Sequence, residues 1–188
     1  MSPSSSEEPP QSPSPSASTS AVPTAASGEP DFPVVGIGAS AGGVDALRRF
    51  FRHLPGEESR SGKESLSGEE DPLGGVAFVV VLHLSPDHES NLTEILQHET
   101  DLPVEEGTDE CPLEPGHVYV IPPQHEMRVE GATLRLSGRS SGPQPDTIDA
   151  LLESLAEDYQ GQAVGIILSG TGADGTLGLR SVKTYGGI

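Results

Sequence analysis

From residue 32 onward, the apolar residues of this chain fall into two alternating patterns. Short continuous apolar runs rich in valine and isoleucine are typical of strands that are buried on both faces. Longer stretches with an apolar residue every three or four positions predict amphipathic helices. The predicted strands are 33–38, 75–82, a shorter one from Val104, 118–121 and 163–168, and the predicted helices are 42–54, 89–100, 146–161 and 175–185.

The order of these elements predicts an α/β domain, because strands that alternate with helices form a largely parallel sheet. Residues 75–82 make the most apolar strand, so we expect it near the centre of the sheet. The segments 127–129 and 133–136 flank a Glu-Gly pair and predict a β-hairpin excursion. Asp146 precedes a predicted helix, and we expect its side chain to cap that helix.

The ends of the chain and one internal stretch do not follow this pattern. Residues 1–31 are mostly Ser, Pro, Ala and Thr, so they cannot bury a core and we expect a disordered tail before a domain at 32–188. Residues 55–75 are rich in Gly, Glu and Ser, which indicates a polar surface insertion. The chain stops at 186–188, where a helix has just ended and a further strand is expected, so we expect the domain to be truncated at its C-terminus.

Composition narrows the classes of function. The 188 residues carry 10 Lys and Arg against 29 Asp and Glu, a net charge of −19, which argues against a nucleic-acid partner. Lysine occurs only at Lys63 and Lys183; the acidity indicates either an ordinary acidic surface or adaptation to a salty cytoplasm. There is no signal-peptide pattern or membrane-length apolar run, and Cys111 has no partner for a disulfide. We therefore expect a cytoplasmic protein without membrane insertion.

A Gly-x-Ser-x-Gly motif at residues 38–42 places Ser40 between a predicted strand and a predicted helix. This is the arrangement of a nucleophilic serine on a sharp turn, where amides at the helix start can stabilise an oxyanion. Residues 36–41 also fit the dinucleotide pattern G-x-G-x-x-A, but a polar loop with Glu57 and Glu58 stands where that motif needs an acidic residue after a second strand. A third reading is a glycine-rich turn that only packs strand against helix.

Three predicted strands deliver candidate catalytic residues to one edge of the sheet. Ser40, His83 and Asp174 each follow a strand, and ligands bind at the carboxyl ends of parallel strands. Serine as nucleophile, histidine as general base and aspartate as the group that orients the imidazole together make an acyl-transfer site. Asp87 and His88 are the alternatives to His83, which we prefer because it directly follows a strand.

Each of these residues also has a purely structural interpretation. A histidine after a strand can be an ordinary loop residue, and Asp174 can be only a helix cap or a turn residue. The other histidines, His53, His98, His117 and His125, have no metal-ligand spacing. Among them only His125 is kept as a candidate supporting residue of the site. The chain order Ser, His, Asp also differs from the Ser, acid, His order of α/β-hydrolases.

Four motifs together carry a resemblance to a known family. They are Ile37-Gly38-Ala39-Ser40-Ala41-Gly42-Gly43, Leu82-His83-Leu84-Ser85-Pro86, Pro115-Gly116-His117-Val118-Tyr119-Val120-Ile121-Pro122-Pro123 and Leu168-Ser169-Gly170-Thr171-Gly172-Ala173-Asp174-Gly175. In this order and spacing, residues 32–188 resemble the CheB-type protein-glutamate methylesterase domain of bacterial chemotaxis, and most of all the version at the start of CheB/CheR fusion proteins.

The resemblance implies a doubly wound, mostly parallel sheet with helices on both faces. It also implies hydrolysis of glutamyl methyl esters on chemoreceptors with release of methanol, and deamidation of some glutamines. By motif, Ser40 is the nucleophile, His83 the general base and Asp174 the orienting carboxylate. The residues implied at the oxyanion site and rim are Ala41, Gly42, Thr171 and Gly172. The family often has threonine at the position of Ala41 and methionine near Thr171. It implies no metal and no organic cofactor.

The same resemblance suggests partners and leaves an alternative open. The expected partner is a methylated chemoreceptor or another signalling protein, with a methyltransferase module in longer relatives. The receiver domain that usually precedes this domain does not occur in this sequence. A catalytically weak or inactive docking module of the same fold is the alternative function.

Overall fold

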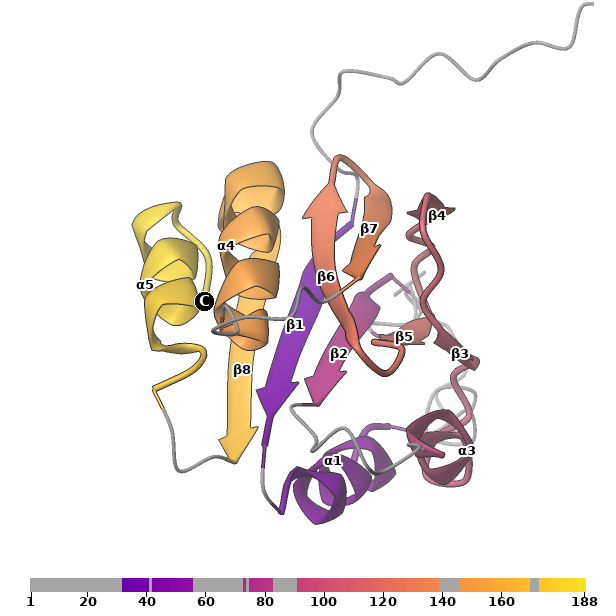
Figure 1. Cartoon of the computed structure of the whole chain (residues 1–188). Coiled ribbons are helices and arrows are strands. Elements are labelled where there is room, and N and C mark those ends of the chain that lie inside the picture. Colours follow the sequence, from indigo (N-terminus) through magenta and orange to yellow (C-terminus); the bar gives the residue numbers. More distant parts are fainter. Residues whose placement is uncertain are drawn as a thin grey trace, which may run out of the picture.

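A parallel sheet with strand order β3-β5-β2-β1-β8 forms the centre of the computed structural model (Figure 1). The structure describes residues 32–40, 42–55, 73, 75–82, 91–138, 146–169 and 173–188. The strands of this sheet are β1 (Val34–Ala39), β2 (Ala77–Leu82), β3 (Val104–Glu106), β5 (Val118–Val120) and β8 (Ala163–Ser169), and the helices are α1 (Gly43–Arg52), α3 (Leu92–Gln97), α4 (Thr147–Tyr159) and α5 (Thr176–Thr184). All pairings in this sheet are parallel, as predicted.

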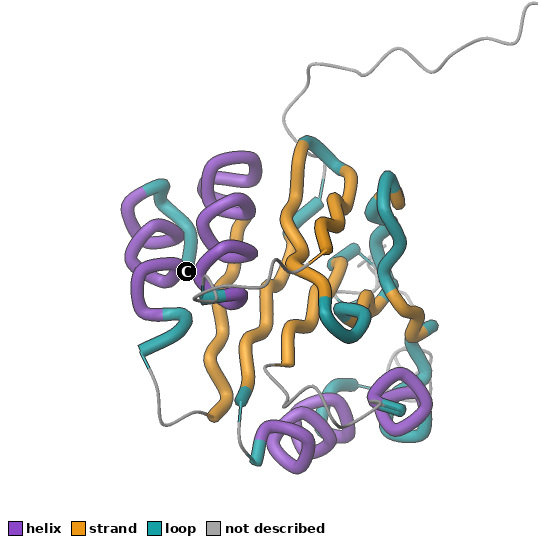
Figure 2. Tube along the Cα trace, in the orientation of Figure 1, coloured by secondary structure: helices purple, strands orange, loops and turns teal. Residues whose placement is uncertain are grey.

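The sheet separates two hydrophobic cores, so helices cover both of its faces. Every residue of β1 and β2 is buried. Alternate side chains of a strand point to opposite faces: Val79 belongs to a core with α4, and Val80 to a core with α1 and α3. The continuous apolar runs in the sequence therefore reflect strands that are covered on both sides, and β2 is central as predicted. Figure 2 shows β1, β2 and β8 ending at one edge of the sheet, with α1 just beyond that edge.

A second sheet of antiparallel strands contains the predicted hairpin. Its order is β4-β7-β6, with β4 at Cys111–Pro112, β6 at His125–Glu130 and β7 at Thr133–Gly138. The hairpin is confirmed and is longer on both sides than the pattern indicated. Strand β4 was not predicted, because two residues with a proline give no strand pattern; it places Cys111 opposite Leu134.

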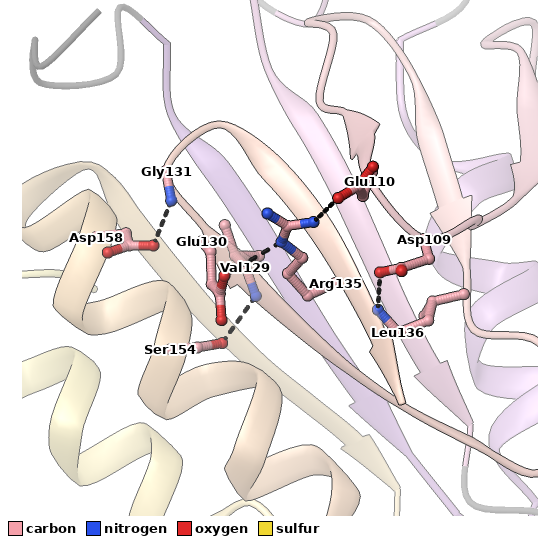
Figure 3. Close-up of polar contacts among 9 residues, drawn as sticks. All are labelled: Asp109, Glu110, Val129, Glu130, Gly131, Arg135, Leu136, Ser154 and Asp158. Atoms are coloured by element: carbon pink, nitrogen blue, oxygen red, sulfur yellow. Dashed lines mark hydrogen bonds and ion pairs between the residues drawn. The ribbon is translucent and has the colours of Figure 1, made fainter. Parts of the chain in front are cut away.

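Helix α4 lies beside strand β6 on one face of the parallel sheet and is hydrogen-bonded to the hairpin of the second sheet (Figure 3). The Val129 amide donates to Ser154 Oγ at 3.0 Å, and Ser154 in turn donates to the Leu151 carbonyl at 2.9 Å. The Gly131 amide donates to Asp158 Oδ2 at 2.7 Å. These contacts join the C-terminal half of α4 to β6 and the hairpin turn, so α4 is held by the second sheet as well as by the parallel sheet that it covers.

The structure corrects several sequence-based boundaries. Strand β8 is only partly buried beyond Ala163, because among the described residues β1 is its one full neighbour and only the backbone of Ile188 pairs on its other side. Helix α3 is shorter than 89–100, and α4 ends at Tyr159 rather than at residue 161. Predictions for residues 1–31 and for most of 55–75 lie outside the described residues.

None of the described helices is long and apolar enough to span a membrane.

Two arginines of α1 hold the turn after α3. Arg48 Nε donates to Glu99 Oε1 at 2.7 Å, and Arg52 Nε donates to Glu99 Oε2 at 2.7 Å. The Glu99 side chain is only 8% exposed. The hydrogen bonds from Arg48 and then Arg52 lower the pKa of the Glu99 carboxyl below its ordinary value. This ion pair fastens α1, which follows Ser40, to the segment that follows β2.

Glu99→Gln tests this contact through the pH dependence of stability. A lowered pKa in the folded state stabilises the protein above the ordinary value of about 4.5 and loses that effect as the pH falls through the lowered pKa. We expect Glu99→Gln to unfold more easily than the wild type at pH 7, with the difference shrinking as the pH falls below about 4.5. Urea unfolding at several pH values measures it, with Glu94→Gln, a change at an exposed residue of α3 just before Glu99, as control. A difference that stays constant down to pH about 3 contradicts this role of the ion pair.

Candidate functional site

Ser40 lies directly after β1, at the carboxyl edge of the parallel sheet. Its amide donates to the Ser169 carbonyl at 3.0 Å, so the loop after β1 is tied to the last residue of β8. Its own carbonyl accepts from the Gly43 amide at 2.7 Å, which closes a tight turn into α1. Ser40 is partly exposed. The turn therefore presents a serine beside the ends of two neighbouring strands.

The turn into α1 depends on a glycine rather than on strain at the serine. Gly42 is the N-cap residue of α1 and has φ +78°, a left-handed conformation that favours glycine. Ser40 is not among the residues with positive φ. The sharp bend that the motif predicted is thus made two residues after the serine. The positive end of the α1 dipole lies next to Ser40, as an oxyanion site requires.

Gly43 brings the start of α1 against the sheet. A Cβ at Gly43 would lie 2.6 Å from Ala39 Cβ and 2.7 Å from Leu82 Cδ1, so no larger residue fits without movement. Ala39 and Leu82 are paired in register at the ends of β1 and β2. The close approach therefore fixes the height of Ser40 above both strand ends.

Asp174 lies on the other side of this edge, just before α5. Its Oδ1 accepts from the Ile148 amide at 3.1 Å and from the Asp149 amide at 3.0 Å, and its Oδ2 lies 3.3 Å from the Ile148 nitrogen. These amides belong to the first turn of α4, where a helix has unpaired donors and a positive dipole end. Asp174 is a helix cap, but it caps α4 and not the helix that it precedes.

This arrangement corrects the expectation for Asp146. Asp146 occupies the N-cap position of α4, but its side chain makes no capping hydrogen bond. The acceptor comes from Asp174, which is distant in the sequence and adjacent in space. A capping rule that uses only local spacing has no means of finding such a partner.

The side chain of Ile148 connects the two halves of the edge. A Cβ at Gly175 would lie 3.1 Å from Ile148 Cγ2, and a Cβ at Gly38 would overlap the same methyl group. Gly38 is two residues before Ser40 in β1, and Gly175 directly follows Asp174. The strand that delivers Ser40 and the loop that carries Asp174 therefore pack around one residue of α4.

Several residues named from the sequence lie outside the described residues, namely His83, Ala41, Thr171 and Gly172, together with the alternatives Asp87 and His88. Leu82, the last residue of β2, is paired with Ala39, so His83 directly follows the strand next to the one that delivers Ser40. Its role stays a prediction. Gly42, the fourth residue named for the rim, is described and exposed.

His125 and His53 are held by contacts with nearby backbone carbonyls. His125 begins β6, with its Nδ1 2.8 Å from the Pro123 carbonyl oxygen. His53 follows α1, with its Nδ1 2.7 Å from the Arg49 carbonyl oxygen. Within the described ranges, no group of three or more His, Cys, Asp or Glu side chains is arranged to hold a metal ion.

Sequence reasoning missed two buried polar groups near this edge. Asp149, only 6% exposed, accepts a hydrogen bond from the Gly178 amide of α5 at 2.6 Å. The Ser169 hydroxyl is buried and has no hydrogen-bond partner among the described residues, and it faces the first turn of α1, 3.3 Å from where a Cβ at Gly43 would lie. The sequence shows Asp149 only as an acidic residue in the first turn of a predicted helix. That position indicates a favourable interaction with the helix dipole but does not identify a hydrogen-bond partner.

Gly43→Ala tests the close approach of α1 to the sheet. The added methyl group overlaps Ala39 and Leu82, so we expect a loss of about 1–3 kcal/mol in the free energy of unfolding and slower covalent labelling of Ser40. The control is Gly138→Ala, where an added Cβ meets nothing within 4 Å and where the change should stay within about 0.5 kcal/mol. Equal stability of the two variants would show that α1 does not lie this close to the strand ends.

The comparisons with known proteins agree on one family. The CheB methylesterase family model matches residues 64–188. A protein-glutamate methylesterase/protein-glutamine glutaminase of Myxococcus xanthus is 32% identical over 87% of this chain and 44% of its own length. The Trichodesmium erythraeum protein of that name is 28% identical over 82% of this chain and 41% of its own length. A Leptospira interrogans protein provisionally given this name is 26% identical over 84% of this chain and 75% of its own length.

The fold agrees with a solved structure as well. The crystal structure of the Thermotoga maritima CheB methylesterase catalytic domain superposes with a TM-score of 0.64 at 28% identity, covering 84% of this chain and 77% of that one. The chain spans less than half the length of the Myxococcus and Trichodesmium relatives. The matched residues include β2 and also α4, β8 and α5, the elements around Asp174. The chain therefore belongs to the CheB methylesterase family.

Proposed function

We propose that this protein is a serine hydrolase that removes methyl groups from glutamate methyl esters on proteins and releases methanol. The observation that carries the proposal is the anchored Asp174 carboxylate at the same sheet edge as Ser40, in a member of the CheB methylesterase family. The partly exposed Ser40, next to the start of α1, supports it. The names of the relatives support the choice of ester.

The reaction uses Ser40 as nucleophile and His83 as general base. Ser40 Oγ attacks the ester carbonyl carbon while His83 removes its proton, and amides at the start of α1 stabilise the oxyanion. The tetrahedral intermediate collapses as His83 protonates the leaving methoxide, giving methanol and an acyl-enzyme. Water, deprotonated by His83, then hydrolyses the acyl-enzyme and leaves a glutamate carboxylate and free Ser40.

Asp174 orients the imidazole of His83 in this scheme. A carboxylate can accept about four hydrogen bonds, so the contacts with the Ile148 and Asp149 amides are compatible with a further bond from an imidazole N–H. The backbone amides of a helix cannot rotate away as side chains can. The carboxylate that aligns the base is therefore held by a rigid element.

The same site supports deamidation of glutamine. The names of the relatives include protein-glutamine glutaminase, and an acyl-enzyme formed from a glutamine side chain with loss of ammonia is the one formed from the methyl ester. We propose a methylated chemoreceptor or another cytoplasmic signalling protein as substrate, with a methyltransferase as the enzyme that supplies the ester. Because the net charge is −19, salt should aid encounter with an acidic substrate segment by screening repulsion.

Methanol release from a methylated receptor fragment tests this proposal. We expect Ser40→Ala and His83→Ala to lower the rate by about a thousandfold or more, since members of such a site act as a unit. An activated phosphonate should label Ser40 in the wild type and not in Ser40→Ala. The rate should rise with pH as His83 loses its proton and becomes able to act as a base.

Two results would overturn the proposal. One is binding of the receptor fragment without methanol release or Ser40 labelling, which is the behaviour of a docking module. The other is a rate that stays flat from pH about 5 to about 9, because a histidine base must titrate in that range.

A further inference from the structure

We propose that Asp149 is a positioning residue for Asp174. By holding the start of α5, its carboxylate keeps Asp174 at the N-terminus of α4, where Asp174 can orient the catalytic base. The inference rests on the proposed function for its effect on the reaction. Its structural part, the control of Asp174 by Asp149, stands on contacts that are independent of any activity.

The N-termini of α4 and α5 are each capped by an aspartate from the neighbouring segment. Asp174, just before α5, accepts from the Ile148 and Asp149 amides in the first turn of α4. In return, Asp149 Oδ1 accepts from the Gly178 amide in the first turn of α5 at 2.6 Å. Asp149 is only 6% exposed and Gly178 is buried. Each helix therefore supplies the cap that the other lacks.

The start of α5 has no cap of its own. Its N-cap residue is Gly175, with φ +93°, and glycine has no side chain to accept a hydrogen bond. Asp149 is the acceptor that the structure gives to the buried Gly178 amide. Without it, that amide would stay buried and unpaired, which destabilises the fold, or the first turn of α5 would have to move.

The two helices touch closely where this exchange takes place. A Cβ at Gly178 would lie 2.5 Å from Leu152 Cβ and 3.2 Å from the Asp149 carbonyl oxygen. The backbone of α5 thus rests on the backbone of α4. A movement of the α5 start cannot be absorbed by flexible side chains at this point.

The segment from Asp174 to Gly178 is consequently fixed at both ends by α4. Asp174 is held by backbone amides, and Gly178 is held by the Asp149 side chain. If the second attachment is lost, the α5 start is free to shift and takes Asp174 with it. A displacement of about 1 Å in a catalytic group can lower a rate by about a hundredfold.

Asp149→Ala and Asp149→Asn separate this role from a general loss of stability. We expect Asp149→Ala to lower kcat for ester hydrolysis by about tenfold or more with KM within about twofold, because the base and not the substrate loses its alignment. Asp149→Asn keeps an oxygen acceptor for the Gly178 amide and should restore kcat to within about threefold of the wild type.

Ser154→Ala is the matched control. Ser154 lies on the same helix and is equally buried, and its hydroxyl accepts from the Val129 amide on the side of the second sheet (Figure 3). Its loss also leaves a backbone amide unpaired, so it should destabilise the chain by an amount similar to that of Asp149→Ala. We expect its kcat to stay within about twofold of the wild type, measured well below both unfolding temperatures.

A double-mutant cycle identifies the group through which Asp149 acts. If it acts through Asp174, Asp149→Ala should change kcat by less than about twofold when Asp174→Ala is already present. Equal loss in both backgrounds overturns the proposal. So does a Ser154→Ala loss as large as that of Asp149→Ala, or a loss in Asp149→Ala that Asp149→Asn does not restore.

Amide hydrogen exchange at Ile148 tests the structural part without activity. The Ile148 amide donates to Asp174, so its exchange should speed up by about tenfold or more in Asp149→Ala and remain near the wild-type rate in Asp149→Asn and Ser154→Ala. Unchanged exchange in Asp149→Ala overturns the proposal whatever the kinetics. If the wild type shows no Ser40-dependent hydrolysis, the proposed function fails, and the exchange rates alone decide whether Asp149 positions Asp174.

Discussion

The rest of the site depends on the hydrogen bonds that the Asp174 carboxylate accepts from two backbone amides of α4. A helix N-terminus needs acceptors for its first amides, and the partly buried Asp174 carboxylate needs donors. The structure satisfies both needs at once. Because Ile148 also packs between β1 and the Asp174 loop, the same contact sets the position of this loop relative to the strand that delivers Ser40.

The part of the site around Ser40 depends on the close approach of the α1 backbone to the ends of β1 and β2. Gly43 lets α1 rest on the ends of β1 and β2, and Gly42 provides the left-handed turn before it. The ion pair of Glu99 with Arg48 and Arg52 then joins α1 to the turn after α3. Ser40, after β1, is thereby held by packing, and Asp174, in the loop between β8 and α5, is held by hydrogen bonds from α4. Such support by rigid elements is what an acyl-transfer site requires.

Much of this could be predicted from the sequence because the signals are local. The apolar runs of β1 and β2 and the hairpin around Gly131 have short-range patterns, and the strand-end rule placed Ser40 and Asp174 at one edge. The capping of α4 could not be predicted in this way, since it joins residues far apart in the sequence and Asp146 offered a closer candidate. The partly exposed β8 was missed because its composition matches that of a covered strand.

A crystal structure of the chain with a phosphonate attached to Ser40 tests the central claim most directly. The account predicts that Asp174 keeps its bonds to the Ile148 and Asp149 amides while the His83 imidazole lies between Asp174 and the Ser40 adduct. An imidazole from another histidine in that place, or an Asp174 carboxylate turned away from the α4 N-terminus, would contradict it.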